Sequence, residues 1–411
     1  MNNCEIVVEF VCPEPNTVFA PIEYRSRLEK VRAAMHRAGI DLLYAASPES
    51  LFYLSGYQAL WYQTQVLENW VPIGGIAVHV DHEEPILFDS EGEKSLCRYT
   101  TVTRDVRILD RRDMALMDFV VDQLKREGWT KGVLGLEMYS SRPPRAISEQ
   151  FQTKMEAAGI GRTVDATAIV NHVRHIKSPQ ELAFTRTAGR IAEVGLEAAR
   201  RAMRPGVTEI EVWGEVMRAV AQAGGENPSI TLPVDAGPKS AVPHSLPSRR
   251  VICRGDIVNV DVCAVYNRYH SDCSRSFSIG APLPQVAAVI EKSARSFDIL
   301  LTHAKVGRPV QEACDALKAY YKEAGLWGDQ WWTGGYELGC AFPPSWVGPW
   351  SYDVDVDNGA KIFESGMVVN YESDFYLPHA AGMSLLIDTL VFEGDDVQFN
   401  NRLPKDLIVV E

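Results

Sequence analysis

The sequence predicts an α+β protein of two domains, a small α/β domain followed by a larger domain of antiparallel strands backed by helices. Three observations carry this prediction. Helical and apolar strand segments alternate through residues 1–170. A long apolar strand at 257–265 is followed by a return strand at 269–279. A helix-plus-hairpin pattern then recurs about 100 residues further along the chain.

The composition is that of an ordinary globular protein, with 411 residues of which 46% are hydrophobic and 23% charged. A net charge of −13 argues against a nucleic-acid footprint, which would be basic. No apolar run approaches the ~18 residues of a membrane span, and the N-terminus does not resemble a signal peptide. The eight cysteines include no CxxC pair, so neither a disulfide framework nor a zinc knuckle is indicated. We therefore expect a cytoplasmic protein.

The first domain is expected to end near residues 166–174. Its first helix follows Pro21 and ends at Gly39, with apolar residues near helical spacing between them. Further helices are predicted at 50–57 and 114–127, and strands at 41–45, 73–80, 84–88 and 132–136.

The second domain begins with a long helix that runs to about Met203. Ser178 is a plausible N-cap, Pro179 stands at the first helical position, and Glu181 places an acid in the first turn.

An internal repeat organises the second domain. Gly206 precedes a helix that ends at Ala223-Gly224, and Gly307 precedes one that ends at Ala324-Gly325. Equal offsets suggest a duplicated unit, although so short a match also allows coincidence. The repeat predicts two antiparallel half-sheets that form one curved sheet, backed by helices, with the site on its concave face.

Two carboxylates lie on adjacent strands of the predicted hairpin. Asp261 is in the middle of the first strand, Asp272 is on the return strand, and 267–268 form the turn. An Asp in an apolar strand is costly unless it is paired, hydrogen-bonded or metal-bound. A structural ion pair with Arg275 is the alternative to a functional role.

Three further features can carry chemistry. Glu372 is another carboxylate in a strand, with the same structural alternative. His244 lies in a Pro-His-x-x-Pro motif, and histidine suits proton transfer at pH 7 because its ordinary pKa is close to neutral. Aromatic residues gather in the segment after residue 330 and can face a cation, or can simply pack in the core. They are Trp331, Trp332, Tyr336, Trp346 and Trp350.

These stretches resemble the family of creatinase, prolidase and methionine aminopeptidase, which share the pita-bread fold. The motif around His244, the spacing of Asp261 and Asp272, and the Glu-x-Gly-Met-Val segment that leads to Glu372 match in order. The resemblance covers nearly the whole chain. It implies a creatinase-like N-terminal α/β domain at 1–170 and a pita-bread catalytic domain at 175–411.

Metal-dependent members of this family bind two metals through two Asp, one His and two Glu. The resemblance assigns Asp261, Asp272 and Glu372 to three of these positions. Tyr336 stands where the His is expected, and Ile387 stands where the last Glu is expected. Three oxygen ligands can hold one weak Mg²⁺ or Ca²⁺, but a two-metal site needs bridging carboxylates. We therefore predict no metal and no other cofactor.

The resemblance points to the metal-free branch represented by creatinase, and the segment 342–346 resembles ectoine hydrolase in particular. It implies hydrolysis of a C–N bond in a small polar metabolite, with His244 as the acid/base. We predict His244, Asp261, Asp272 and Glu372 as catalytic, and a cationic or zwitterionic substrate because three carboxylates without a metal need a positive partner. Predicted substrate contacts from this domain are Tyr336, Trp332 and Trp346.

A loop of the first domain adds a prediction about assembly. In creatinase-like dimers the loop corresponding to 56–63 reaches the partner's site, so the resemblance implies a homodimer. Trp61 and Tyr62 are then candidates for substrate contact from the other subunit, or are merely aromatic residues of a surface loop.

Other functions stay open at this stage. One is a metal-dependent Xaa-Pro aminopeptidase or dipeptidase with an altered metal site. Some relatives are lyases, so elimination is a second possibility. A non-catalytic ligand-binding protein is a third, and the retention of His244 with all three carboxylates weighs against it.

Overall fold

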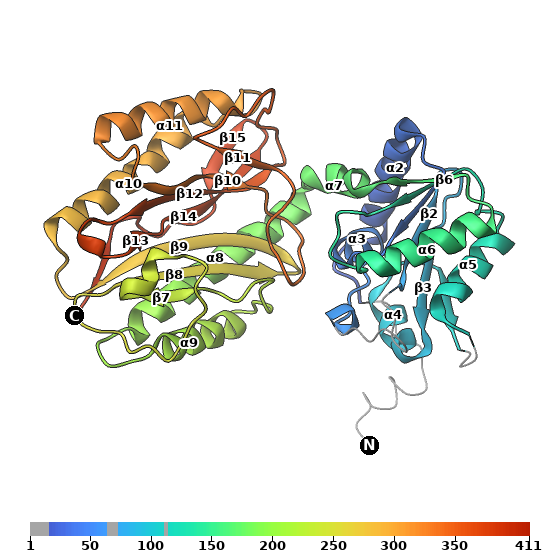
Figure 1. The fold of residues 1–411 in the computed structure, drawn as a ribbon, viewed down its shortest axis with the longest axis horizontal. Coiled ribbons are helices and arrows are strands. Elements are labelled where there is room, and N and C mark those ends of the chain that lie inside the picture. The colour runs from blue at the N-terminus through green and yellow to red at the C-terminus, as the bar shows by residue number, and fades with distance from the viewer. Residues whose placement is uncertain (1–15, 64–72, 111–113) are drawn as a thin grey trace, which may run out of the picture. The chain divides into compact units, whose positions relative to one another are not determined.

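The structure is a computed structural model that describes residues 16–63, 73–110 and 114–411. The chain divides into two compact units, Met1–Arg174 and His175–Glu411. Each unit has its own sheet (Figure 1). Within the described ranges, no helix is long and apolar enough to cross a membrane.

The first unit is a six-stranded mixed sheet in the order β4-β3-β2-β1-β5-β6. Strand β1 pairs antiparallel with β2 and parallel with β5, so the unit is an α/β domain as predicted. Its strands are β1 (Leu42–Ala45), β2 (Gly75–His79), β3 (Ile86–Ser90), β4 (Asp105–Leu109), β5 (Val133–Leu136) and β6 (Arg162–Asp165). Its helices are α2 (Pro21–Ala38), α3 (Pro48–Ser55), α4 (Lys94–Thr100), α5 (Leu116–Arg126), α6 (Arg145–Ala158) and α7 (Thr167–His175), with 3₁₀ turns η1 (Trp61–Gln63) and η2 (Glu91–Glu93).

The second unit is built on one large sheet with the main order β11-β10-β12-β14-β9-β8-β7. Its strands are β7 (Val234–Ala236), β8 (Ile257–Tyr266), β9 (Tyr269–Ile279), β10 (Gln330–Tyr336), β11 (Ser351–Asp353), β12 (Val368–Tyr376), β13 (Met383–Ser384), β14 (Ile387–Glu393), β15 (Asp396–Phe399) and β16 (Ile408–Val410). Its helices are α8 (Pro179–Ala202), α9 (Glu209–Gln222), α10 (Pro284–His303) and α11 (Val310–Ala324), with 3₁₀ turns η3 (Gly237–Ala241) and η4 (Pro378–Ala380).

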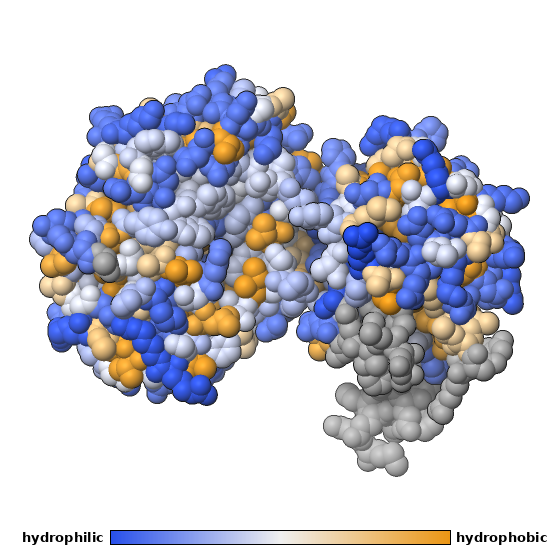
Figure 2. Space-filling view, in the orientation of Figure 1, coloured by the Kyte–Doolittle hydropathy of each residue, from blue (hydrophilic) through white to orange (hydrophobic). Residues whose placement is uncertain are grey.

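Helices back the two halves of this sheet in the same way. In Figure 1, α8 and α9 run along the half that contains β8 and β9, while α10 and α11 run along the half that contains β12. Each half has its own apolar core of buried side chains. On the face shown in Figure 2, hydrophilic residues predominate and apolar residues form only scattered patches.

The predicted repeat is confirmed by matching backbone contacts. The Gly206 amide donates to the Ile252 carbonyl at 2.9 Å, and the Gly307 amide donates to the Phe363 carbonyl at 2.7 Å. Both glycines have positive φ, 97° and 78°, which a side chain would disfavour. The sequence therefore repeats these glycines because each half needs the same tight entry into its second helix.

The β8–β9 hairpin places one polar face opposite the helices. Its turn residues Asn267 and Arg268 have φ of 50° and 65°, which is the backbone of a two-residue hairpin turn. Val260 and Val262 pack in the apolar core, so Asp261 between them points to the other face. Asp261 lies opposite Ser274 in the register of this hairpin.

Candidate active site

Four carboxyl groups gather on the sheet face opposite the helices. We call Asp261 of β8, Asp272 of β9, and Glu372 and Asp374 of β12 the acidic cluster. Asp261 and Glu372 are each 7% exposed, and the other two are fully buried. The structure thus brings together three of the predicted catalytic residues and adds a fourth carboxyl.

Asp261 and Asp272 form one carboxyl pair. Burial raises the pKa of both groups, and the hydrogen bond between the two carboxyls lowers the pKa of Asp261 while raising that of Asp272. Such a bond requires one of the two groups to carry a proton. The Ser274 hydroxyl donates to Asp261 Oδ1 at 2.5 Å. Asp272 Oδ1 is buried and has no hydrogen-bond partner among the described residues.

Glu372 and Asp374 form the second carboxyl pair. Burial, followed by the charge of Asp261, raises the pKa of Glu372 to about 7. Burial and the neighbouring Glu372 raise the pKa of Asp374 well above its ordinary value. Sequence reasoning missed Asp374, although the two-residue period of a strand places it on the same face as Glu372.

Asn370 and Tyr336 connect the two pairs. The Asn370 side-chain amide donates to Glu372 Oε1 at 2.7 Å and to Asp272 Oδ2 at 3.3 Å. The Tyr336 hydroxyl donates to Asp272 Oδ2 at 3.3 Å. Burial and then the nearby carboxylates raise the pKa of Tyr336 well above its ordinary value, so its phenol is neutral. Sequence reasoning also missed Asn370, which the two-residue period of the strand places on the same face as Glu372.

Ile387 lies inside this arrangement, on β14. It is paired in register with Glu372 on one side and with Ser274 on the other, and it is almost completely buried. Its side chain packs with Met383, Leu385 and Trp331. A hydrocarbon side chain therefore occupies the position at which the family resemblance expects a carboxylate. The next residue, Asp388, is instead ion-paired with Arg275 at 3.0 Å.

Two of the predicted tryptophans lie against Tyr336. The Trp346 indole N–H donates to the Tyr336 hydroxyl at 3.1 Å. The Trp332 ring stacks on the Tyr336 ring with a centroid distance of 6.2 Å. Trp350 lies elsewhere, packed against His175 and Tyr352. Of the predicted aromatic residues, Tyr336, Trp332 and Trp346 therefore lie beside the acidic cluster, and Trp350 does not.

His244 lies at the exposed edge of the site. It sits in an irregular loop after η3, and its ring meets the edge of Trp331 at a centroid distance of 5.4 Å. His244 is close enough to Asp261 to lower the pKa of that carboxyl electrostatically. The predicted acid/base and the predicted carboxylates therefore belong to one site.

The two aromatic residues predicted from the first unit are placed differently. The Tyr62 side chain is 6% exposed and lies among residues of the first unit. The Trp61 side chain lies outside the described part of the structure. Their contact with a partner's site stays a prediction.

The arrangement matches known proteins in both units. Residues 183–401 match the family described as "Metallopeptidase family M24", and residues 27–176 match the "Creatinase/Prolidase N-terminal domain". The chain is 26% identical over 371 residues to an Xaa-Pro dipeptidase of Pyrococcus furiosus, covering 90% of this chain and 96% of the relative. It is 25% identical over 365 residues to the ectoine hydrolase of Halomonas elongata, covering 80% of this chain and 83% of the relative.

Solved structures show the same fold. The prolidase of Pyrococcus horikoshii aligns with a TM-score of 0.78 and 22% identity over 93% of this chain and all of that one. The prolidase of Thermococcus sibiricus aligns with a TM-score of 0.80 and 18% identity over 95% of this chain and all of that one. These matches confirm the predicted pita-bread fold with a creatinase-type N-terminal domain.

Proposed function

The chain belongs to metallopeptidase family M24. We propose that, unlike the metal-dependent members, this hydrolase works without a metal. We propose further that it cleaves a carbon–nitrogen bond in a small cationic or zwitterionic metabolite. The bond is an amide, an amidine or a cyclic amidine. We include in the proposal that the enzyme is a cytoplasmic homodimer. Among the described residues, Cys97, Cys253, Cys263, Cys273 and Cys314 are free thiols, which suits a reducing compartment.

The observation that carries the proposal is Ile387 between Glu372 and Ser274. A two-metal centre needs carboxylates that bridge the ions, and a hydrocarbon side chain has no donor atom. Tyr336 offers only a neutral phenol, and its hydroxyl already donates to Asp272. Among the described residues, no group of three or more His, Cys, Asp or Glu side chains is arranged to hold a metal ion. The residues do not fit a two-metal centre.

The acidic cluster supports a positively charged substrate. Within the described part of the chain, no lysine or arginine forms an ion pair with Asp261, Asp272 or Glu372. Ionising several adjacent carboxyls is unfavourable until a positive charge arrives. A substrate cation supplies that charge, and the faces of Trp332 and Tyr336 offer it a second attractive surface.

His244 is the group placed to move protons. It takes a proton from the attacking water and returns it to the nitrogen that leaves, so water attacks the carbon directly. Asp261 lies close enough to His244 to interact with it electrostatically. Glu372 binds the cationic part of the substrate in its ionised form.

Chelation tests the proposal. A thermal-shift screen of small cationic and zwitterionic metabolites first identifies the substrate, with ectoine and an Xaa-Pro dipeptide included. The purified enzyme is then dialysed against EDTA and its turnover of that substrate is measured. Turnover should survive chelation, and the metal content should be well below two ions per chain. Loss of turnover with recovery on adding Mn²⁺ or Co²⁺ would instead support an Xaa-Pro peptidase, the activity named for the Pyrococcus furiosus relative.

A further inference from the structure

We propose that Glu209 and Lys239 form a clamp that holds the His244 loop, defined as residues 237–247, in its working position. Among the described residues, neither forms a hydrogen bond or ion pair with the acidic cluster, so both are positioning residues. The proposal rests on the proposed role of His244 as acid/base.

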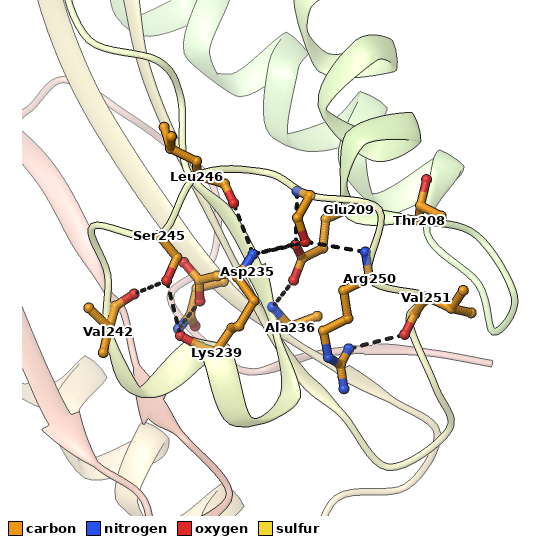
Figure 3. Close-up of polar contacts among 12 residues, drawn as sticks. Thr208, Glu209, Asp235, Ala236, Lys239, Val242, Ser245, Leu246, Arg250 and Val251 are labelled. Carbon is orange, nitrogen blue, oxygen red and sulfur yellow. Dashed lines mark hydrogen bonds and ion pairs between the residues drawn. The ribbon is translucent and has the colours of Figure 1, made fainter.

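Glu209 joins the two ends of the loop at one carboxylate. It is the first residue of α9 and its side chain is 0% exposed. It accepts a hydrogen bond from the Ala236 amide before the loop, at 3.0 Å (Figure 3). It accepts another from the Ser248 amide after the loop, also at 3.0 Å. The Ser248 hydroxyl adds a third bond at 2.6 Å. One buried side chain therefore fixes the distance between the loop's ends.

Lys239 ties the interior of the loop to the same carboxylate. Its ammonium lies 2.6 Å from Glu209 Oε2 and donates to the Leu246 carbonyl at 2.9 Å (Figure 3). The Ser245 hydroxyl donates to the Val242 carbonyl at 2.9 Å. In the sequence, His244 lies within the spans that these two hydrogen bonds close, 239–246 and 242–245. The clamp therefore restrains its backbone position.

Beyond Pro243, which is buried, apolar packing offers the loop little support. Val242 is 54% exposed, Leu246 is 68% exposed, and His244 itself is exposed. Apart from the 3₁₀ turn η3 at its start, the loop contains no helix or strand. A misplacement of about 1 Å in a catalytic group can cost about 10²-fold in rate, so a loop held mainly by polar contacts needs a rigid anchor.

Hydrogen exchange measured by mass spectrometry tests the clamp without a substrate. The test variants are Glu209→Gln and Lys239→Met, and the second keeps the Ala236 and Ser248 bonds in case the first fails to fold. The matched control is Glu211→Gln, which makes the same charge change in the same helical turn, where the carboxylate accepts hydrogen bonds only from Thr208 among the described residues. Exchange in the peptide 237–249 should rise at least about tenfold in both test variants and stay at the wild-type rate in the control.

Two exchange results would overturn the proposal. One is a wild-type exchange rate in the loop of both test variants. The other is a Glu209→Gln variant in which α9 and β7 open together with the loop while Lys239→Met behaves as wild type, because Glu209 would then be an ordinary structural residue.

Steady-state kinetics on the substrate found in the screen complete the test. We expect kcat to fall about 10–10²-fold in Glu209→Gln with KM nearly unchanged, and Glu211→Gln to match wild type. A loosened loop with wild-type kcat would overturn the clamp's role. His244→Ala then separates the two claims: an inactive variant would leave the proposed function standing, and an active one would remove it as well.

Discussion

Two buried glutamates in the second unit have opposite surroundings. Glu337 lies between the Lys177 ammonium at 2.6 Å and His175 Nδ1 at 2.9 Å. Burial alone would raise its pKa, but the charge of Lys177 and the hydrogen bond with His175 lower it to about 2. Glu372 has carboxyls as its neighbours, and burial followed by the charge of Asp261 raises its pKa to about 7.

The difference separates a structural carboxylate from a functional one. The charge of Glu337 is compensated within the fold, so breaking its ion pair should destabilise the protein rather than affect chemistry. The charge of Glu372 is opposed by the fold, an arrangement typical of a site that awaits a ligand or a proton. The predictions below test this contrast at each glutamate, from the largest expected effect to the smallest.

His244→Ala should abolish the reaction near Glu372 while the protein still folds. Loss of a general acid/base costs about 10²–10⁴-fold in rate. The comparison variant is His175→Gln beside Glu337, which should lower the melting temperature and keep most of kcat. Steady-state kinetics and thermal unfolding measure both, and a His244→Ala enzyme with near wild-type kcat would discard the mechanism.

Lys177→Met should destabilise the fold by about 3–5 kcal/mol, because it leaves the buried Glu337 charge without its ammonium partner. Glu372→Gln should change stability by less than about 1 kcal/mol or increase it, since it removes an unfavourable buried charge. Denaturant unfolding at pH 8 measures the free energy of unfolding of both variants. A larger loss in Glu372→Gln than in Lys177→Met would reverse the assignment of the two glutamates.

The two glutamates should also shape the pH dependence of stability in opposite directions. With a folded pKa of about 7, Glu372 contributes stability that is present below its ordinary pKa and is lost as the pH rises towards 7 and above. With a folded pKa of about 2, Glu337 contributes stability that is present above its ordinary pKa and is lost as the pH falls towards 2.

We expect each contribution to be about 1–3 kcal/mol. Glu372→Gln should flatten the decline of the free energy of unfolding between pH 4.5 and 8, and Glu337→Gln should flatten the decline below pH 4.5. Wild-type slopes in both variants would mean that neither pKa departs from its ordinary value.

The sequence predicts the scaffold of the site better than its electrostatics. The family resemblance assigns Asp261, Asp272 and Glu372 to one site, and the predicted hairpin brings the first two onto adjacent strands. Strand alternation alone would have added Asn370 and Asp374. The contrast between Glu337 and Glu372 could not be predicted, because it depends on Lys177, which is remote in sequence and reaches Glu337 only through the fold.

The contacts of Glu209 with the His244 loop could not be predicted from the sequence either. Glu209 reads as an ordinary acid in the first turn of a helix, as does Glu211 two residues later. Backbone hydrogen bonds from the Glu209 amide to the Arg250 carbonyl and from the Ile210 amide to the Ser248 carbonyl hold the helix start beside the end of the His244 loop. The burial of Glu209 between the two ends of the His244 loop depends on the folded chain, and no local sequence pattern predicts it.

The central claim is that the acidic cluster receives a substrate cation, and calorimetry with acetamidinium and its neutral isostere acetamide tests it most directly. Wild-type enzyme after EDTA treatment should bind the cation at least about tenfold more tightly, because the cation relieves the repulsion among the carboxyls. Glu372→Gln should lose most of this preference. Equal affinity of wild type for the two ligands would contradict the account and show that the cluster is simply protonated.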